Sequence, residues 1–177
     1  MENNSCQINQ GGRNNNVSSM QKKIKFENGI VFAVPLSNSE YGIGMVTKKY
    51  KRITIGYFFK IIFSKLPGIL SKEFLCAENV ILIAQFSSLG IENGEWPLVK
   101  SNFIFNSNEW PMPLFKMQHP ITEQYFAVEY DETLLNDRRF LISKEVAKNL
   151  YGDGLFGYGA LEKELDGILK NSNPTYL

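Results

Sequence analysis

The chain has 177 residues, of which 44% are hydrophobic and 13% aromatic, and its formal net charge at pH 7 is +1. This length and composition indicate one domain that can bury a substantial core without cross-links. The two cysteines, Cys6 and Cys76, are too few and too distant to form a disulfide framework or a metal-ligand set. A reducing cytoplasm fits this cysteine usage best.

Charge is unevenly distributed along the sequence. Residues 22–66 contain nine Lys/Arg and two Glu, a net charge of +7, whereas residues 67–135 contain three Lys and nine Asp/Glu, a net charge of −6. If the two segments do not interleave in the fold, the molecule has a basic side and an acidic side. The alternative is a set of surface charges that neutralise one another.

The N-terminal residues differ in composition from the rest of the chain. Residues 1–21 are rich in Asn, Ser, Gln and Gly, which predicts a disordered leader before a single domain at residues 22–177. The leader has no apolar core that could serve as a signal peptide. The most apolar stretch, ITIGYFFKIIFSKL, is interrupted by Gly56, Lys60 and Lys65 and is too short to span a bilayer. We therefore expect a soluble cytoplasmic protein without a membrane partner.

The first half of the domain is predicted to consist mainly of strands. KIKFENGIVFAVPL predicts two strands around an Asn28–Gly29 turn, and YGIGMVTKKYK and ITIGYFFKII predict two more with a short basic connection. The glycines at positions 42, 44 and 56 indicate bends or close backbone approaches. SKLPGILSKEFLCAE follows as a connection with one helical turn. NVILIAQF is continuously apolar, which predicts a central strand covered on both faces.

The tripeptide Glu-Trp-Pro occurs twice, at residues 95–97 and 109–111, and contains both tryptophans. Glu92-Asn93-Gly94 predicts a tight hairpin before the first copy, because Asn-Gly tolerates positive φ. Proline lacks the N–H of a strand ladder and pushes the preceding residue toward extended geometry. Trp96 and Trp110 are therefore predicted at the matched starts of two strands in an antiparallel meander. Contact of one tryptophan with a partner protein is the competing interpretation.

The last third alternates and then changes to helical spacing. In TEQYFAVEYDE the core face is predicted to hold Gln124, Phe126, Val128 and Tyr130, and the solvent face Glu123, Tyr125, Ala127, Glu129 and Asp131. RRFLISKEVAKNLYGDG and GALEKELDGILK predict two C-terminal helices from about residue 143, with Ser143 as the first N-cap. We therefore predict an α+β fold, with a mainly antiparallel sheet or a small barrel-like β domain before the helices.

Signatures of catalysis and of cofactor binding are weak. GDGLFGYG, residues 152–159, satisfies Gly-x-Gly-x-x-Gly, but it follows a predicted helix instead of a strand, so a linker between helices is predicted. His119 has no partner nucleophile or ligand set, and Cys76 is interpreted as a small core residue. The carboxylates could include a glycosidase-like pair, but they fall where solvated acids usually lie. We predict no enzyme activity, cofactor, metal or small-molecule substrate.

A basic segment supports an alternative function. TKKYKR followed by GYFFK interleaves cations with aromatic residues, as nucleic-acid-binding barrels do. The opposing interpretation places Phe58 and Phe59 in the core and the lysines on a loop. Because no RNP-type motif is present, nucleic-acid binding through Lys48–Arg52 is kept only as the alternative.

GIVFAVPLSNSEYGIGMV combines a Gly-x-x-Phe-Ala-x-Pro-Leu strand, a short polar turn and Tyr-Gly-x-Gly-x-Val. With LGIENGEWPLV and the closing GYGALEKEL, the sequence resembles bacterial immunity protein family 26, mainly over residues 22–117. The resemblance implies a non-enzymatic protein that binds and neutralises a cognate toxin of a polymorphic or contact-dependent inhibition system. Many such toxins are nucleases with basic clefts, which an acidic inhibitor surface would complement.

Candidate toxin-binding residues come from the acidic segment and from the Glu-Trp-Pro repeats. The alternating strand offers Glu123, Tyr125, Glu129 and Asp131, and the predicted hairpin offers Glu92 and Glu95. Trp96 or Trp110 is a candidate aromatic anchor.

Overall fold

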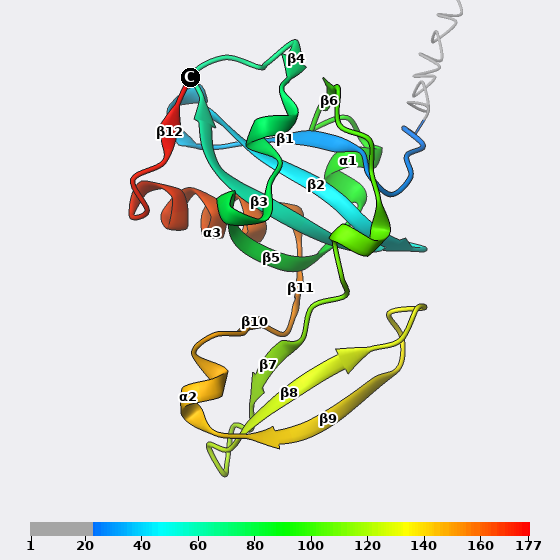
Figure 1. Ribbon diagram of the computed structural model, residues 1–177, viewed down its shortest axis with the longest axis vertical. Helices are drawn as coiled ribbons and strands as arrows, with labels where there is room; N and C mark the ends of the chain where they lie inside the picture. The colour runs from blue at the N-terminus through cyan, green and yellow to red at the C-terminus, as the bar shows by residue number, and fades with distance from the viewer. Residues whose placement is uncertain (1–22) are drawn as a thin grey trace, which may run out of the picture.

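Two open β-sheets form the framework of the computed structural model, which describes residues 23–177 (Figure 1). The large sheet has the order β11 (Leu155–Phe156), β5 (Val80–Ser87), β3 (Ile53–Phe63), β2 (Tyr41–Tyr50), β1 (Val31–Pro35), β6 (Leu98–Ser101) and β4 (Ile69–Leu70), and β12 (Thr175–Tyr176) also pairs with β3. The small sheet has the order β10 (Tyr151–Gly152), β7 (Phe115–Gln118), β8 (Tyr125–Tyr130) and β9 (Asp137–Ile142).

Helices are short, and two of the three within residues 23–177 follow the last long strand. They are α1 (Leu89–Glu92), α2 (Lys144–Ala147) and α3 (Tyr158–Lys170), with 3-10 turns η1 (Ser37–Ser39), η2 (Lys72–Phe74), η3 (Ala77–Asn79) and η4 (Ser107–Glu109). The predicted α+β class is confirmed. The barrel-like alternative is not formed, because the large sheet ends at β11 and β4 without closing. The predicted leader at residues 1–21 lies outside the described residues.

The core lies on both faces of the large sheet. On one face α3 buries Leu161, Leu165 and Leu169 against a cluster that includes Phe32, Phe58, Phe86 and Trp96. On the other face a second cluster joins Ile43, Ile55 and Phe59 to Trp110 and to Phe115 and Val128 of the small sheet. The large sheet is therefore a middle layer, which explains why its central strands are apolar on both sides.

The strand β5 and the three glycines agree with the sequence prediction. The apolar part of NVILIAQF, from Val80 onward, forms β5 between β3 and β11. An added Cβ at Gly42 would lie 2.9 Å from Leu165 of α3, and at Gly44 and Gly56 it would lie 2.6 and 2.7 Å from aromatic rings. These positions are close approaches that leave no room for a side chain.

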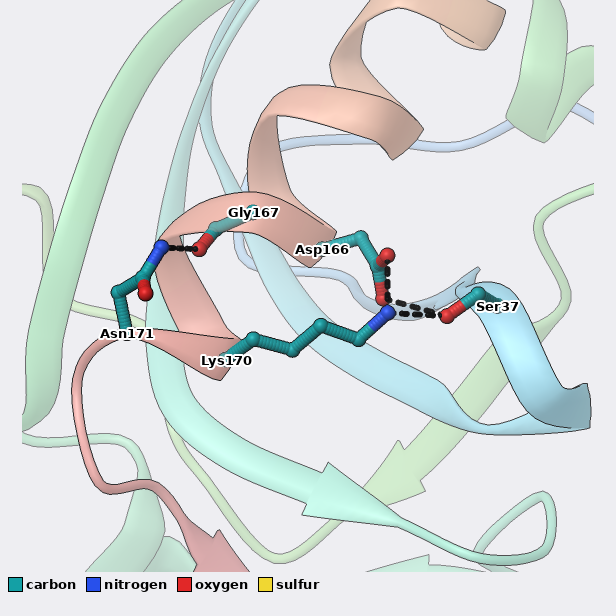
Figure 2. Close-up of polar contacts among 5 residues, drawn as sticks. All are labelled: Ser37, Asp166, Gly167, Lys170 and Asn171. Carbon is teal, nitrogen blue, oxygen red and sulfur yellow. Dashed lines mark hydrogen bonds and ion pairs between the residues drawn. The ribbon is translucent and has the colours of Figure 1, made fainter.

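Polar contacts fasten the end of α3 to the loop after β1 (Figure 2). Asp166 accepts a hydrogen bond from the Ser37 hydroxyl at 3.1 Å and forms an ion pair with Lys170 at 2.6 Å. Lys170 also donates to Ser37, and Asn171 donates from its side chain to the Gly167 carbonyl at 2.8 Å. These hydrogen bonds and the ion pair connect the C-terminal end of α3 to the loop after β1, while the apolar face of the helix packs on the sheet.

Several predicted elements take other forms. Residues 23–27 form no strand, and the Ile24 N–H instead donates to the Glu92 carbonyl at 2.9 Å. Asn93 and Gly94 do not close a hairpin but end α1, with their N–H groups donating to carbonyls of that helix. The RRFLI segment, which precedes the helix predicted from about residue 143 and for which no strand was predicted, forms β9. The Gly-rich linker contains β10 and β11, which pair in parallel with β7 and β5.

The predicted meander of matched Trp-Pro strands is wrong. β6, which follows Trp96, pairs with β1 and β4, whereas β7, which follows Trp110, pairs with β8 and β10. The two strands therefore belong to different sheets. Ser143 does cap α2, since its hydroxyl accepts a hydrogen bond from the Val146 N–H at 3.3 Å.

Candidate protein-binding surface

The eight candidate residues do not form one site. Glu92 and Glu95 lie between β5 and β6 of the large sheet. Glu123, Tyr125, Glu129 and Asp131 lie on β8 of the small sheet or in the turns that flank it. The two tryptophans belong to the core on opposite faces of the large sheet.

Burial removes both tryptophans from the candidate surface. Trp96 is 0% exposed, its ring stacks on Phe32 at a centroid distance of 5.6 Å, and its indole N–H donates to Glu162 at 2.8 Å. Trp110 is 7% exposed and packs edge-on against Tyr57 at 5.1 Å. The proposal that one of them is a surface anchor is therefore corrected: both rings stabilise the fold.

Glu92 is held by groups of the protein itself. Its carboxylate accepts a hydrogen bond from Ser88 at 2.6 Å and lies 3.5 Å from Lys23 and 3.9 Å from Lys49. The Ser88 hydrogen bond, aided by the two lysines, lowers the pKa of Glu92. Glu95 is exposed in the following turn, and no ion pair of Glu95 occurs within residues 23–177.

The basic and acidic segments of the sequence meet at Glu92 and at Glu132. Lys23 and Lys49 pair with Glu92, and Lys48 pairs with Glu132 of the β8–β9 turn. The charge asymmetry of the sequence is therefore partly neutralised within the fold. This favours the interpretation in which the surface charges neutralise one another over the one with separate basic and acidic sides.

Three of the four aromatic residues of the basic segment are buried, and the fourth, Tyr50, is half-buried. Phe58 and Phe59 are fully buried, and the Lys49 ammonium lies 3.7 Å from the centroid of the buried Phe26 ring. A groove of about 730 Å³ beside them is lined by Lys23, Lys25 and Lys49 but also by Glu27 and Glu92. This arrangement offers no exposed phenylalanine platform on which bases could stack, so the observations do not favour the nucleic-acid alternative.

One face of the small sheet combines aromatic and charged residues, of which Arg138 and Phe140 are exposed. The β8–β9 register pairs Tyr125 with Ile142, Ala127 with Phe140, and Glu129 with Arg138. Strand alternation places these six side chains on one face. Phe140 is 48% exposed, and Glu129 forms an ion pair with Arg138 at 3.3 Å. We call this set the hairpin face.

Ala127 is the exception to the predicted solvent face, because it is buried. Its register partners, Lys116 on β7 and Phe140 on β9, have long side chains on either side of it, and α2 also contacts β8. A small residue between two large ones can be buried on a face whose other side chains are exposed or half-buried.

The turns at the two ends of β8 use their polar residues for local structure. Asp131 accepts hydrogen bonds from Asn136 at 2.6 Å and from the Thr133 hydroxyl at 2.7 Å. The Asn136 and Thr133 bonds lower the pKa of Asp131 to about 2. At the other end the Glu123 N–H donates to the His119 carbonyl at 2.9 Å, while the Glu123 side chain is exposed.

Sequence reasoning missed Phe140, Arg138 and Leu141, because no strand was predicted before the helix that begins at about residue 143. All three side chains are exposed, so β9 has no alternation of buried and exposed residues that could have identified it as a strand. The aromatic and β-branched content of RRFLI was the only available signal.

Within residues 23–177 no helix is long and apolar enough to cross a membrane. In the same range no cluster of three or more His, Cys, Asp or Glu side chains could hold a metal ion.

An α+β domain with a partly exposed sheet face is an architecture that a binding protein can use, and comparison with protein families specifies the class. The immunity protein 26 family model matches residues 27–127, which is 101 of 177 residues and more than half of the chain. The chain belongs to the immunity protein 26 family. Membership confirms the predicted resemblance, supports an immunity role, implies a toxin partner and suggests a non-enzymatic function. No curated protein and no solved structure matches the chain.

Proposed function

We propose that this protein neutralises a cognate bacterial toxin by binding it through the hairpin face. The observation that carries the proposal is the match to immunity protein 26 over residues 27–127. Immunity acts through association with the toxin, and the hairpin face offers the residue types that dominate binding energy in interfaces, an exposed aromatic ring and an arginine.

The extent of the family match also supports this face. The match ends at Ala127, within β8, so the second half of that strand and the whole of β9 lie outside the shared segment. A partner-specific surface is expected where a chain departs from the pattern common to its family. Glu129, Arg138 and Phe140 all lie after residue 127, outside the matched segment.

We further propose that the toxin is a nuclease of a contact-dependent inhibition or related system, met in the cytoplasm. Exposed carboxylates at Glu95 and Glu123 could complement a basic nuclease cleft and speed the encounter. Asp131 adds negative charge at the end of the hairpin, although its carboxylate also holds the turn.

Co-expression with the toxin-like domain encoded immediately upstream tests the proposal. We expect a one-to-one complex and restored growth of cells that carry the active toxin. A folded, active toxin that neither binds the protein nor is silenced by it would overturn the immunity proposal.

Variants then test the surface. Glu123→Lys combined with Glu129→Lys should weaken binding, whereas Asp131 is left intact because its replacement would disturb the turn. Glu164→Lys is the control for a single charge reversal, to be compared also with Glu123→Lys alone, since it reverses an exposed charge on α3, on the opposite face of the large sheet. Equal affinities of the double variant and the control would place the interface elsewhere.

A further inference from the structure

β9 is a free edge of the small sheet. The sheet order ends at β9, which pairs only with β8 among the described strands. Asp137 to Leu141 are exposed and Ile142 is half-buried. An edge of this kind presents unpaired backbone N–H and C=O groups to which another strand can pair.

The hydrogen bonds at the β8–β9 turn show which backbone groups are free. The Asp131 N–H donates to the Asn136 carbonyl at 3.0 Å, so these residues form a hydrogen-bonded pair. Hydrogen-bonded and non-hydrogen-bonded pairs alternate along an antiparallel ladder. The next bonded pairs are therefore those of Arg138, Phe140 and Ile142 with β8. The backbone groups of Asp137, Arg139 and Leu141 point to the free side.

The other side of β8 gives the same result independently. At the β7–β8 turn the His119 N–H donates to the Gln124 carbonyl at 2.8 Å, which makes that pair hydrogen-bonded. Counting from it, Phe126 and Val128 bond to β7, which leaves Tyr125, Ala127 and Glu129 to bond to β9. Both turns therefore give the same assignment: the backbone groups of Arg138, Phe140 and Ile142 bond to β8, and those of Asp137, Arg139 and Leu141 point to the free side.

β9 lacks most of the features that prevent an edge strand from pairing with a strand of another chain. Its register with β8 is continuous over six pairs without a bulge, and it contains no proline. Its charges are paired internally, Arg138 with Glu129 and Arg139 with Asp137 at 2.5 Å. The second half of β9, residues 140–142, is apolar, and Leu141 is 64% exposed.

We propose that the cognate toxin adds an extended strand to β9 and bonds to the backbone of Asp137, Arg139 and Leu141. This inference rests on the proposed function and specifies its mode of binding. The toxin strand would place apolar side chains opposite Phe140 and Leu141. A second copy of the chain is the competing occupant: antiparallel pairing about Arg139 would set two arginines directly opposite each other, which is destabilising, whereas pairing about Phe140 would not. The family's implied toxin partner favours the toxin over a second copy.

Proline substitution tests the inference, with alanine as the matched control. Leu141→Pro and Arg139→Pro each remove one N–H that points away from β8, and an edge strand tolerates proline at such positions. Leu141→Ala and Arg139→Ala shorten the same side chains but keep the N–H. Circular dichroism and the melting temperature establish which variants fold.

Affinity for the upstream toxin domain, made catalytically inactive, is the measured quantity. We expect each proline variant to bind at least about tenfold more weakly than its alanine counterpart, because the toxin strand would lose a backbone bond and leave a buried group unpaired. Hydrogen exchange of the wild-type complex gives a second readout, in which the Arg139 and Leu141 amides should become protected.

The outcomes separate the two proposals. A wild-type protein that does not bind the toxin contradicts the proposed function itself. A wild-type protein that binds, with equal affinities for proline and alanine variants or with unprotected Arg139 and Leu141 amides, contradicts strand addition alone. Dimerisation of the free protein that is lost in Leu141→Pro would instead assign the edge to a second copy.

Discussion

Tyr130 of β8 donates its phenolic hydrogen to Oδ1 of Asp153 over 2.8 Å, and this bond links the small sheet to the segment that returns to the large one. The same oxygen accepts a hydrogen bond from Gln85 of β5 at 3.3 Å. The Asp153 N–H donates to the Lys116 carbonyl of β7 at 2.7 Å. Asp153, in the Gly-rich segment that resembles a phosphate loop, therefore joins the two sheets.

Tyr130→Phe should weaken this junction. The substitution removes one hydrogen bond to a carboxylate in a partly buried place and should lower the free energy of unfolding by about 1–2 kcal/mol. Urea denaturation measures the change. Tyr125→Phe is the control, because Tyr125 is half-buried on the same strand and no side-chain hydrogen bond of it occurs within residues 23–177. Equal losses in the two variants would show that the Asp153 bond contributes nothing.

Stability should decline in alkaline solution. Burial raises the pKa of Tyr57 and of Tyr130 to about 12, with further contributions from Tyr151 and from Asp153 respectively. Because the folded pKa lies above the unfolded value of about 10, the unfolded chain releases these protons first. The contribution to stability is complete below about pH 10 and is lost as the pH rises toward 12.

Urea denaturation at several pH values between 9 and 11.5 should show this decline. Tyr57→Phe, which also removes the hydrogen bond to the Pro111 carbonyl at 2.6 Å, should be less stable at neutral pH but lose less on alkalinisation. A pH dependence as steep as that of the wild type would contradict the assignment to Tyr57.

Gly90→Ala should destabilise the protein. An added Cβ would lie 2.8 Å from the Trp96 ring, which cannot move because it is buried between Phe32 and Phe86. Overpacking of this kind costs about 1–3 kcal/mol. Gly167→Ala is the matched control, since nothing lies within 4 Å of its added Cβ and alanine favours the helix by about 0.5–1 kcal/mol. Thermal melts should therefore move in opposite directions for the two variants.

The two tryptophans should respond differently to phenylalanine. Trp96→Phe loses the bond to Glu162 and part of the stack on Phe32, and should cost about 2 kcal/mol. The Trp110 indole N–H is buried without a hydrogen-bond partner among the described residues, so Trp110→Phe removes an unpaired polar group and should cost less. Urea denaturation of both variants measures the difference, and a larger loss in Trp110→Phe would contradict this account.

Local patterns predicted most of the large sheet. β2 and β3 follow from apolar runs separated by Lys51 and Arg52, and β5 follows from NVILIAQF. Ser143 predicted the start of α2, and the helical spacing of GALEKELDGILK predicted α3, although α2 ends at Ala147, before the glycines that were expected to terminate it. In these segments propensity, periodicity and burial favour the same structure, which is why the prediction succeeded.

Pairing between distant segments was not predictable in this way. Asn93 and Gly94 have the local chemistry of a hairpin, and Gly94 does adopt a positive φ of 78°, but the bond from the Trp96 N–H to the Gly90 carbonyl closes a helix end instead. β6 then pairs with β1, through Leu98 with Phe32 and Val99 with Val31. Of the hairpin face, Tyr125 and Glu129 were predicted, because they lie on a strand with alternating polarity. Phe140 was not predicted, because β9 has no such alternation.

The position of α3 in the sequence has a consequence for synthesis. Phe32, Phe58 and Phe86 leave the ribosome long before Leu161, Leu165 and Leu169, which cover them in the folded protein. A nascent chain that lacks residues 158–170 would carry an open apolar face of the kind that chaperones bind. If the protein is an antidote, protection would begin only after translation has passed this helix, so a cell would depend on molecules made before the toxin arrives.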